Sequence, residues 1–198
     1  MKRFILLPSL LLAINAFGQF PLQQGGNQPF VTGLEDVTGI ERLELVGGYG
    51  ERTDNFRLMV HWDMLERARK HFDLNLSLAL NYSLFDGEEN ALGDTPRMRD
   101  VGLTPTFTFF SKKEYGGFRP FLEAGIGLHY LTDKHFTTKD FSTNFQFGDH
   151  IGMGVQFGQN HHLRLAYQFQ HLSNAGMGSP NPGINFHLLN FGVKLGGK

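Results

Sequence analysis

Long runs in which apolar and polar side chains alternate one by one are the feature that most constrains the fold of this chain. In the clearest run, every even position from Phe72 to Leu84 is apolar and the positions between them are polar or small. Successive side chains of a strand point to opposite faces, so this period predicts a strand and not a helix. The run is longer than the ~5–6 residues usual in soluble sheets and approaches the ~9–11 residues of a strand that crosses a membrane at a tilt.

Similar alternation recurs along the chain and predicts eight strands, over residues 41–51, 56–64, 72–84, 99–110, 118–130, 144–158, 163–173 and 184–195. Closed bacterial outer-membrane barrels have an even number of antiparallel strands. We therefore predict an all-β fold, an eight-stranded antiparallel transmembrane β-barrel over residues 41–198. Pro105 lies within one of these strands, where it cannot donate to a ladder, so we expect a bulge or a weakened ladder there. A soluble β-sandwich remains the alternative, and the strand lengths disfavour it.

Charged side chains fall on the opposite face of several predicted strands from the apolar ones. Small eight-stranded barrels have interiors filled by side chains and not pores. We expect a charged network inside the barrel, and its candidate members are Arg57, Asp63, Asp73, Arg119 and Glu123.

The first residues predict export from the cytoplasm. Residues 1–18 begin with basic side chains, continue with an apolar run over residues 4–13 and end in small residues. This order is typical of a secretory signal peptide, here cleaved after Gly18. The apolar run is short of the ~20 residues that a membrane-spanning helix needs, which disfavours an anchor. Residues 19–40, rich in Gln, Gly and Pro, are interpreted as an irregular periplasmic lead-in.

Composition excludes several other functions. The formal net charge of −1 gives no attraction to nucleic acid, and the absence of cysteine excludes disulfides and a thiol nucleophile. Three histidines, His150, His161 and His162, have no acidic or cysteine partner at a spacing typical of metal ligands, so we expect no metal and no cofactor.

A histidine and a serine extend the apolar face of the predicted strand 163–173. Its odd positions from 163 to 169 are apolar, and His171 and Ser173 follow at the next two odd positions. Residues two apart on a strand have Cα atoms roughly 6–7 Å apart on one face. Their side chains can then approach hydrogen-bond distance, as the activation of a serine by a base requires.

The residues that follow supply further groups for acyl transfer. Asn174 offers a side-chain amide and Gly176 an open backbone N–H, both of which are donor types that stabilise an oxyanion. A turn at residues 180–183 then returns the chain, which brings Asn185 back towards His171.

With these residues in view, the segment 171–185 resembles the outer-membrane lipid A 3-O-deacylase (PagL) family, through His-x-Ser-Asn-Ala and Asn-Pro-Gly followed by a final amphipathic strand. The resemblance implies an eight-stranded barrel that hydrolyses the acyl chain ester-linked to the 3-position of lipid A. It implies His171 as general base, Ser173 as nucleophile, and Asn174 with Gly176 as oxyanion donors. Lipid A or lipopolysaccharide would be the substrate and outer-membrane lipid the surroundings, while a monomer and a homodimer both stay open.

One position departs from the family pattern, because Asn185 stands where the family's triad has Glu. An asparagine oxygen can orient the imidazole but cannot supply a full negative charge. We predict an active enzyme with Asn185 as the orienting residue, and the alternative is a non-catalytic structural or adhesive outer-membrane barrel. The parity of the strands also predicts that His171, Ser173 and Asn185 lie on the lipid-facing outside of the barrel, towards the outer leaflet.

Overall fold

A computed structural model describes residues 39–89 and 93–195 of the chain. The predicted signal peptide, residues 1–18, lies outside the described residues, as does the lead-in apart from its last two residues.

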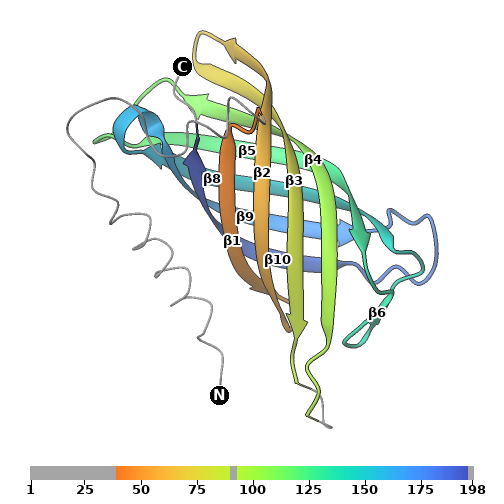
Figure 1. Cartoon of the computed structure of the whole chain (residues 1–198). Helices are drawn as coiled ribbons and strands as arrows, with labels where there is room; N and C mark the ends of the chain where they lie inside the picture. Colours follow the sequence, from red (N-terminus) through yellow and green to blue (C-terminus); the bar gives the residue numbers. More distant parts are fainter. Residues whose placement is uncertain (1–38, 90–92, 196–198) are drawn as a thin grey trace.

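Eight long antiparallel strands form a closed barrel, which confirms the predicted fold class (Figure 1). Strands that follow one another are neighbours, and the barrel closes where β1 pairs with β10. No helix within residues 39–89 and 93–195 is long and apolar enough to cross a membrane. The barrel strands are β1 (Arg42–Gly50), β2 (Thr53–Ala68), β3 (Phe72–Gly87), β4 (Arg97–Ser111), β5 (Arg119–Leu131), β8 (Phe145–Phe157), β9 (Leu163–Ser173) and β10 (Ile184–Lys194).

The strands differ from the predicted ones mainly in length. The second strand, predicted over residues 56–64, spans Thr53–Ala68 and contains a bulge between Asp63 and Leu65, which shifts the register against β3. Pairing of β4 with β5 is interrupted at Thr104 and Pro105 and resumes in the same register. This confirms the weakened ladder expected at the proline, because its nitrogen carries no hydrogen to donate.

A short hairpin lies in the connection between β5 and β8, where the sequence analysis predicted no strand. It is formed by β6 (His135–Phe136) and β7 (Lys139–Asp140). Two-residue strands are too short to show an alternating pattern, so periodicity could not predict them.

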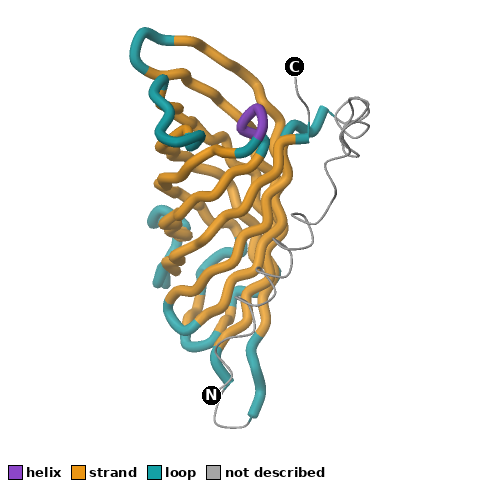
Figure 2. Tube along the Cα trace, turned by 90° about the vertical axis from the view of Figure 1, so that its left-hand side faces the viewer, coloured by secondary structure: helices purple, strands orange, loops and turns teal. Residues whose placement is uncertain are grey.

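The two ends of the barrel differ in what they carry. One end, called here the termini end, holds Gly39, Leu195 and three turns, one of which contains the 3₁₀ turn η1 (Gln159–His161), drawn in purple in Figure 2. The other end, called here the loop end, holds the turn between β1 and β2 and the connections from β3 to β4, from β5 to β8 and from β9 to β10.

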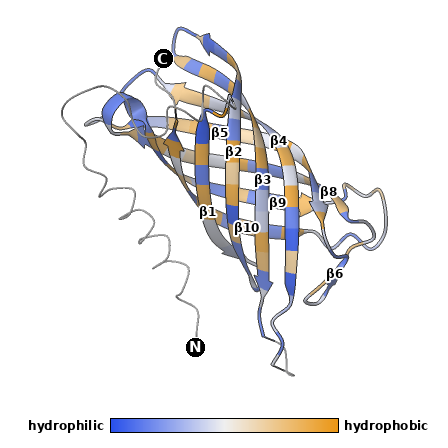
Figure 3. Cartoon of the chain, in the orientation of Figure 1, coloured by the Kyte–Doolittle hydropathy of each residue, from blue (hydrophilic) through white to orange (hydrophobic). Residues whose placement is uncertain are grey.

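Side chains alternate between an apolar outside and a polar inside. Figure 3 shows the corresponding bands of hydrophobic and hydrophilic residues along the strands. Outward residues such as Ile126 and Ile151 are exposed, whereas Arg57 and Arg164 are almost completely buried in the interior. Several of the buried charged side chains have hydrogen-bond partners on other strands. Arg57 donates to Ser83 Oγ at 2.8 Å and to Gln170 Oε1 at 2.5 Å.

Four of the five predicted interior charges take part in such contacts. Besides Arg57, Glu123 accepts from Arg164, and Arg119 forms an ion pair with Asp73. The fifth, Asp63, is half-buried and lines a cavity of about 260 Å³ at the termini end of the interior.

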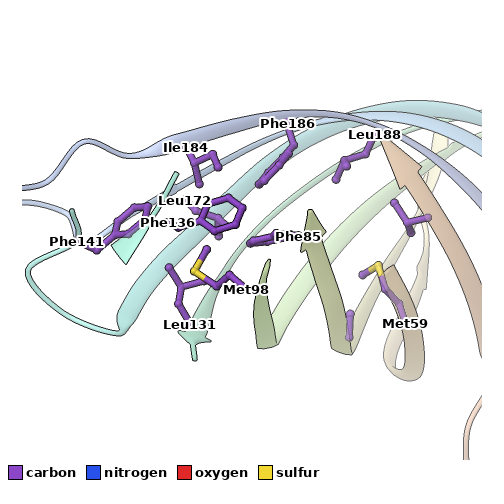
Figure 4. Close-up of a cluster of buried hydrophobic side chains, with 12 residues drawn as sticks. Met59, Phe85, Met98, Leu131, Phe136, Phe141, Leu172, Ile184, Phe186 and Leu188 are labelled. Atoms are coloured by element: carbon purple, nitrogen blue, oxygen red, sulfur yellow. The ribbon is translucent and has the colours of Figure 1, made fainter. Parts of the chain in front are cut away.

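A cluster of buried apolar side chains fills the barrel at the loop end (Figure 4). Phe85 lies close to Phe136, from the β6–β7 hairpin, and to the inward-facing Phe186 of β10. Leu172 of β9 and Ile184 of β10 belong to the same cluster and are fully buried. The inward side chains of β9 and β10 are therefore fixed by close packing immediately behind the residues that these strands direct outward.

Candidate active site

The paired strands β9 and β10 bring two of the predicted site residues into direct contact on the outside of the barrel. Asn185 is the register partner of His171, and Nδ1 of His171 lies 2.7 Å from Oδ1 of Asn185. An amide oxygen can only accept, so Nδ1 of His171 carries the hydrogen and donates it. In the neutral imidazole, Nε2 is then the nitrogen that can accept a proton, as a general base requires.

Ser173 lies two residues beyond His171 on the same outward face, at the last position of β9. Its side chain is half-buried. Within the described residues, Ser173 and His171 form no hydrogen bond with each other; catalytic hydrogen bonds often tighten only when substrate is in place.

Gly183 lies against the imidazole of His171. A Cβ atom built on Gly183 would be 2.8 Å from Cε1 and 3.4 Å from Nε2 of His171, and the glycine has a φ of +61°. Both the contact and the backbone conformation favour glycine at this position. The turn before β10 thus limits where the ring of His171 can lie.

Asn174 and Gly176, the predicted oxyanion donors, lie together in the loop that follows β9. Asn174 is buried, and its Nδ2 donates to Ser142 Oγ at 2.6 Å and to Gly178 O at 2.9 Å. The N–H of Gly176 donates to Oδ1 of Asn174 at 2.9 Å, and the N–H of Asn174 donates to Oδ1 of Asn181 at 3.0 Å. A role for Asn174 or Gly176 in oxyanion binding requires exchange of these bonds and stays a prediction.

Two further charged residues meet at the site, and sequence reasoning did not find them. Oε1 of Glu51 accepts from Nδ2 of Asn185 at 2.6 Å and from its backbone N–H at 2.9 Å. Oε2 of Glu51 lies 2.5 Å from Nζ of Lys139, which also donates to Gly183 O at 2.7 Å. Burial alone would raise the pKa of Glu51, but hydrogen bonds from Lys139 and Asn185 outweigh it and lower the pKa below its ordinary value.

The closure of the barrel is the signal that could have revealed Glu51. Tyr49 of β1 is the register partner of His187 of β10. Two residues further along each strand, the same antiparallel register sets Glu51 opposite Asn185.

An acidic residue on the outward face was also missed. Asp149 of β8 is the register partner of His171 on the side away from Asn185, and it is exposed. Parity could have found it, because it occupies an outward position among the apolar residues of β8.

Comparison with known proteins assigns the chain to a family. A sequence model described as "Lipid A 3-O-deacylase (PagL)" matches residues 54–194. The chain is 40% identical to the lipid A deacylase PagL of Bordetella bronchiseptica over 119 residues, which are 60% of this chain and 61% of that protein. It is 26% identical to the lipid A deacylase PagL of Pseudomonas aeruginosa over 162 residues, which are 76% of this chain and 83% of that protein.

A solved structure agrees with the fold. The barrel superposes on the crystal structure of the outer membrane enzyme PagL with a TM-score of 0.67 at 22% identity, covering 77% of this chain and 98% of the other. The family match covers most of the barrel, including β9, β10 and the loop between them. The chain belongs to the lipid A 3-O-deacylase (PagL) family.

Proposed function

We propose that this protein is an outer-membrane esterase that removes the acyl chain ester-linked to the 3-position of lipid A. The observation that carries the proposal is the hydrogen bond of 2.7 Å between Nδ1 of His171 and Oδ1 of Asn185, with Ser173 on the same outward face. The family to which the chain belongs supports the substrate class.

Each residue has a distinct part in the proposed reaction. Nε2 of His171 takes the proton of Ser173 as its Oγ attacks the ester carbonyl. The tetrahedral intermediate breaks the bond to the sugar oxygen, which leaves with the proton from His171. Water, deprotonated by His171, then attacks the acyl-enzyme and releases the fatty acid and Ser173. Asn185 keeps the imidazole in the required tautomer throughout.

The position of the site suits a lipid substrate. Neighbouring outward residues of β8 and β9 include Phe147 and Phe169, so apolar surface adjoins the reactive groups. Acyl chains can lie against this surface while the ester reaches Ser173 at the loop end. A soluble substrate would not need the nucleophile on the outside of a barrel.

The same proposal includes the route to the membrane. Residues 1–18 act as a signal peptide that is cleaved after Gly18 on export. N-terminal sequencing of protein purified from outer membranes tests this step: a mature chain that begins at Gln19 supports it, and one that retains Met1 contradicts it.

Mass spectrometry of lipid A from cells that express the protein tests the activity, with Ser173→Ala as the control. Loss of one 3-hydroxyacyl chain with the wild-type protein, and not with the variant, is the expected result. Unchanged lipid A with both proteins, each folded in the outer membrane, would contradict it. That outcome would favour the alternative of a non-catalytic barrel, for which Asn185 at the family's Glu position is the supporting feature.

A further inference from the structure

We propose that Glu51 is a positioning residue of the catalytic site, which supplies through Asn185 the orientation of His171 that a triad carboxylate would supply directly. The inference rests on the proposed esterase function and adds a fourth member to the chain Ser173–His171–Asn185. Glu51 lies in the turn between β1 and β2, far from the other three in sequence.

The contacts run in an unbroken series from the base to the carboxylate. Asn185 Oδ1 accepts from His171, and Nδ2 of the same amide donates to Glu51 Oε1 at 2.6 Å. The backbone N–H of Asn185 donates to the same oxygen at 2.9 Å. When His171 takes a proton during the reaction, the amide dipole of Asn185 lies between the imidazolium and the carboxylate. Hydrogen bonds in such a chain polarise one another.

Glu51 also determines which way the amide of Asn185 is turned. An ionised carboxylate only accepts hydrogen bonds, so the NH₂ group of Asn185 must face Glu51 and its oxygen must face His171. Nδ1 of His171 is then the protonated nitrogen, which leaves Nε2 of the neutral ring as the acceptor. The carboxylate of Glu51 thus fixes the tautomer of His171 indirectly, through the amide of Asn185.

Because Lys139 also binds Glu51, an uncharged amide at position 51 cannot replace the carboxylate of Glu51. Its Nζ donates to Oε2 of Glu51 and to Gly183 O, so Glu51 needs one acceptor oxygen for Lys139 and another for Asn185. A glutamine at position 51 has a single oxygen. If Lys139 retains that oxygen, the glutamine NH₂ group faces Asn185, the amide of Asn185 turns over, and its own NH₂ group faces His171. The imidazole then carries its hydrogen on Nε2 and cannot accept the proton of Ser173.

The test compares Glu51→Gln with Glu88→Gln in detergent-folded full-length protein. Glu88 is a matched control, because it is an acidic residue of the loop end that forms an ion pair with Arg52 at 3.2 Å. Glu51→Gln is expected to lower kcat/KM for lipid A about 10- to 100-fold, less than the ~10²–10⁴-fold that a general base contributes as a whole. Glu88→Gln is expected to leave kcat/KM within about twofold.

Two further readouts separate this role from a structural one. In ¹⁵N-histidine NMR spectra, assigned with His171→Gln, His171 should carry its hydrogen on Nδ1 in the wild type and on Nε2 in Glu51→Gln. The double variant Asn185→Glu with Glu51→Gln should recover activity, because Glu at position 185 accepts directly from His171 and from the amide at position 51.

The inference is overturned if folded Glu51→Gln keeps both the activity and the tautomer of the wild type, or if the double variant is no more active than Glu51→Gln. If the proposed function itself is wrong, the result is different: the wild-type protein is as inactive towards lipid A as Ser173→Ala. In that case the tautomer measurement still decides whether Glu51 orients Asn185 and His171.

Discussion

Gly183 lies so close to the imidazole of His171 that a Cβ atom on it would be 2.8 Å from the ring's Cε1. Gly183→Ala is therefore expected to displace the ring and to lower kcat/KM towards lipid A by up to about 10²-fold, the effect of a misplacement of about 1 Å. The measurement is the rate of 3-hydroxyacyl release by purified protein in mixed micelles.

Gly116 provides the matched control for this variant. Its φ of +60° is nearly that of Gly183, but a Cβ atom there would meet nothing within 4 Å. Gly116→Ala shares the backbone cost of about 1–2 kcal/mol and should keep wild-type activity. Equal losses of activity in the two alanine variants would show that backbone strain, and not the ring contact, is responsible.

Asn174 tests the predicted oxyanion site. Asn174→Ala should lower kcat by about 10²–10³-fold, the usual cost of losing one oxyanion donor. Ser142→Ala removes an acceptor of Nδ2 but leaves the bond to Gly178 O, so it should keep activity within about threefold of the wild type. Single-turnover kinetics would distinguish the two, and equal losses would mean that the loop contact is what matters.

The ionisation of Glu51 gives a prediction about pH. Because its pKa is lowered in the folded protein, the charge on Glu51 and the bonds that depend on it persist below the ordinary glutamate value of about 4.3, and are lost only as the pH falls through the lowered pKa. Carboxyl ¹³C NMR of Glu51 should give a midpoint below that value. Lys139→Gln should raise the midpoint, whereas Lys134→Gln, which changes an exposed lysine of the same connection, should not. An unchanged midpoint in Lys139→Gln would refute the assignment of the lowered pKa to this ion pair.

The apolar cluster behind the site should dominate local stability. Phe186 is completely buried and its ring centroid lies 4.9 Å from that of Phe85. Phe186→Ala is expected to lower the free energy of unfolding by about 3–5 kcal/mol, as is usual for a buried phenylalanine. Leu189→Ala, on the outward face of the same strand, is the comparison and should cost less. Urea unfolding from lipid vesicles measures both, and similar values would indicate that the cluster does not stabilise this end.

Alternation was sufficient to predict the eight strands and the face on which the site lies. A side-chain period of two is local, so it can be found without knowledge of neighbouring strands. The same argument set His171 and Ser173 on the outward face, and the turn that returns β10 beside β9 brought Asn185 to His171 as predicted. The extension of β2 beyond residue 64 was missed because the bulge between Asp63 and Leu65 reverses the parity.

The part of the site that was missed depends on contacts between distant segments. Glu51 stands in an ordinary polar turn, and nothing near it in sequence distinguishes it from Arg52 or Asp54. Its partner Asn185 is 134 residues away and is reached only when the first and last strands pair. Lys139 reaches the site from a hairpin too short to produce a pattern. A local sequence pattern cannot reveal such residues. The register of paired strands around the closed barrel can reveal them, because it shows which residues lie opposite one another.

Because Ser173 and His171 face outward, the substrate concentration that matters for the proposed reaction is the concentration of lipid A within the membrane. For the proposed reaction, substrate arrives by diffusion within the leaflet and never from bulk water, so the rate depends on the mole fraction of lipid A in the membrane. Diluting whole cells or vesicles should leave the turnover per protein unchanged, whereas diluting lipid A with other lipids should lower it. The water that completes the proposed reaction comes instead from the aqueous phase, so the two reactants reach the same serine from different phases.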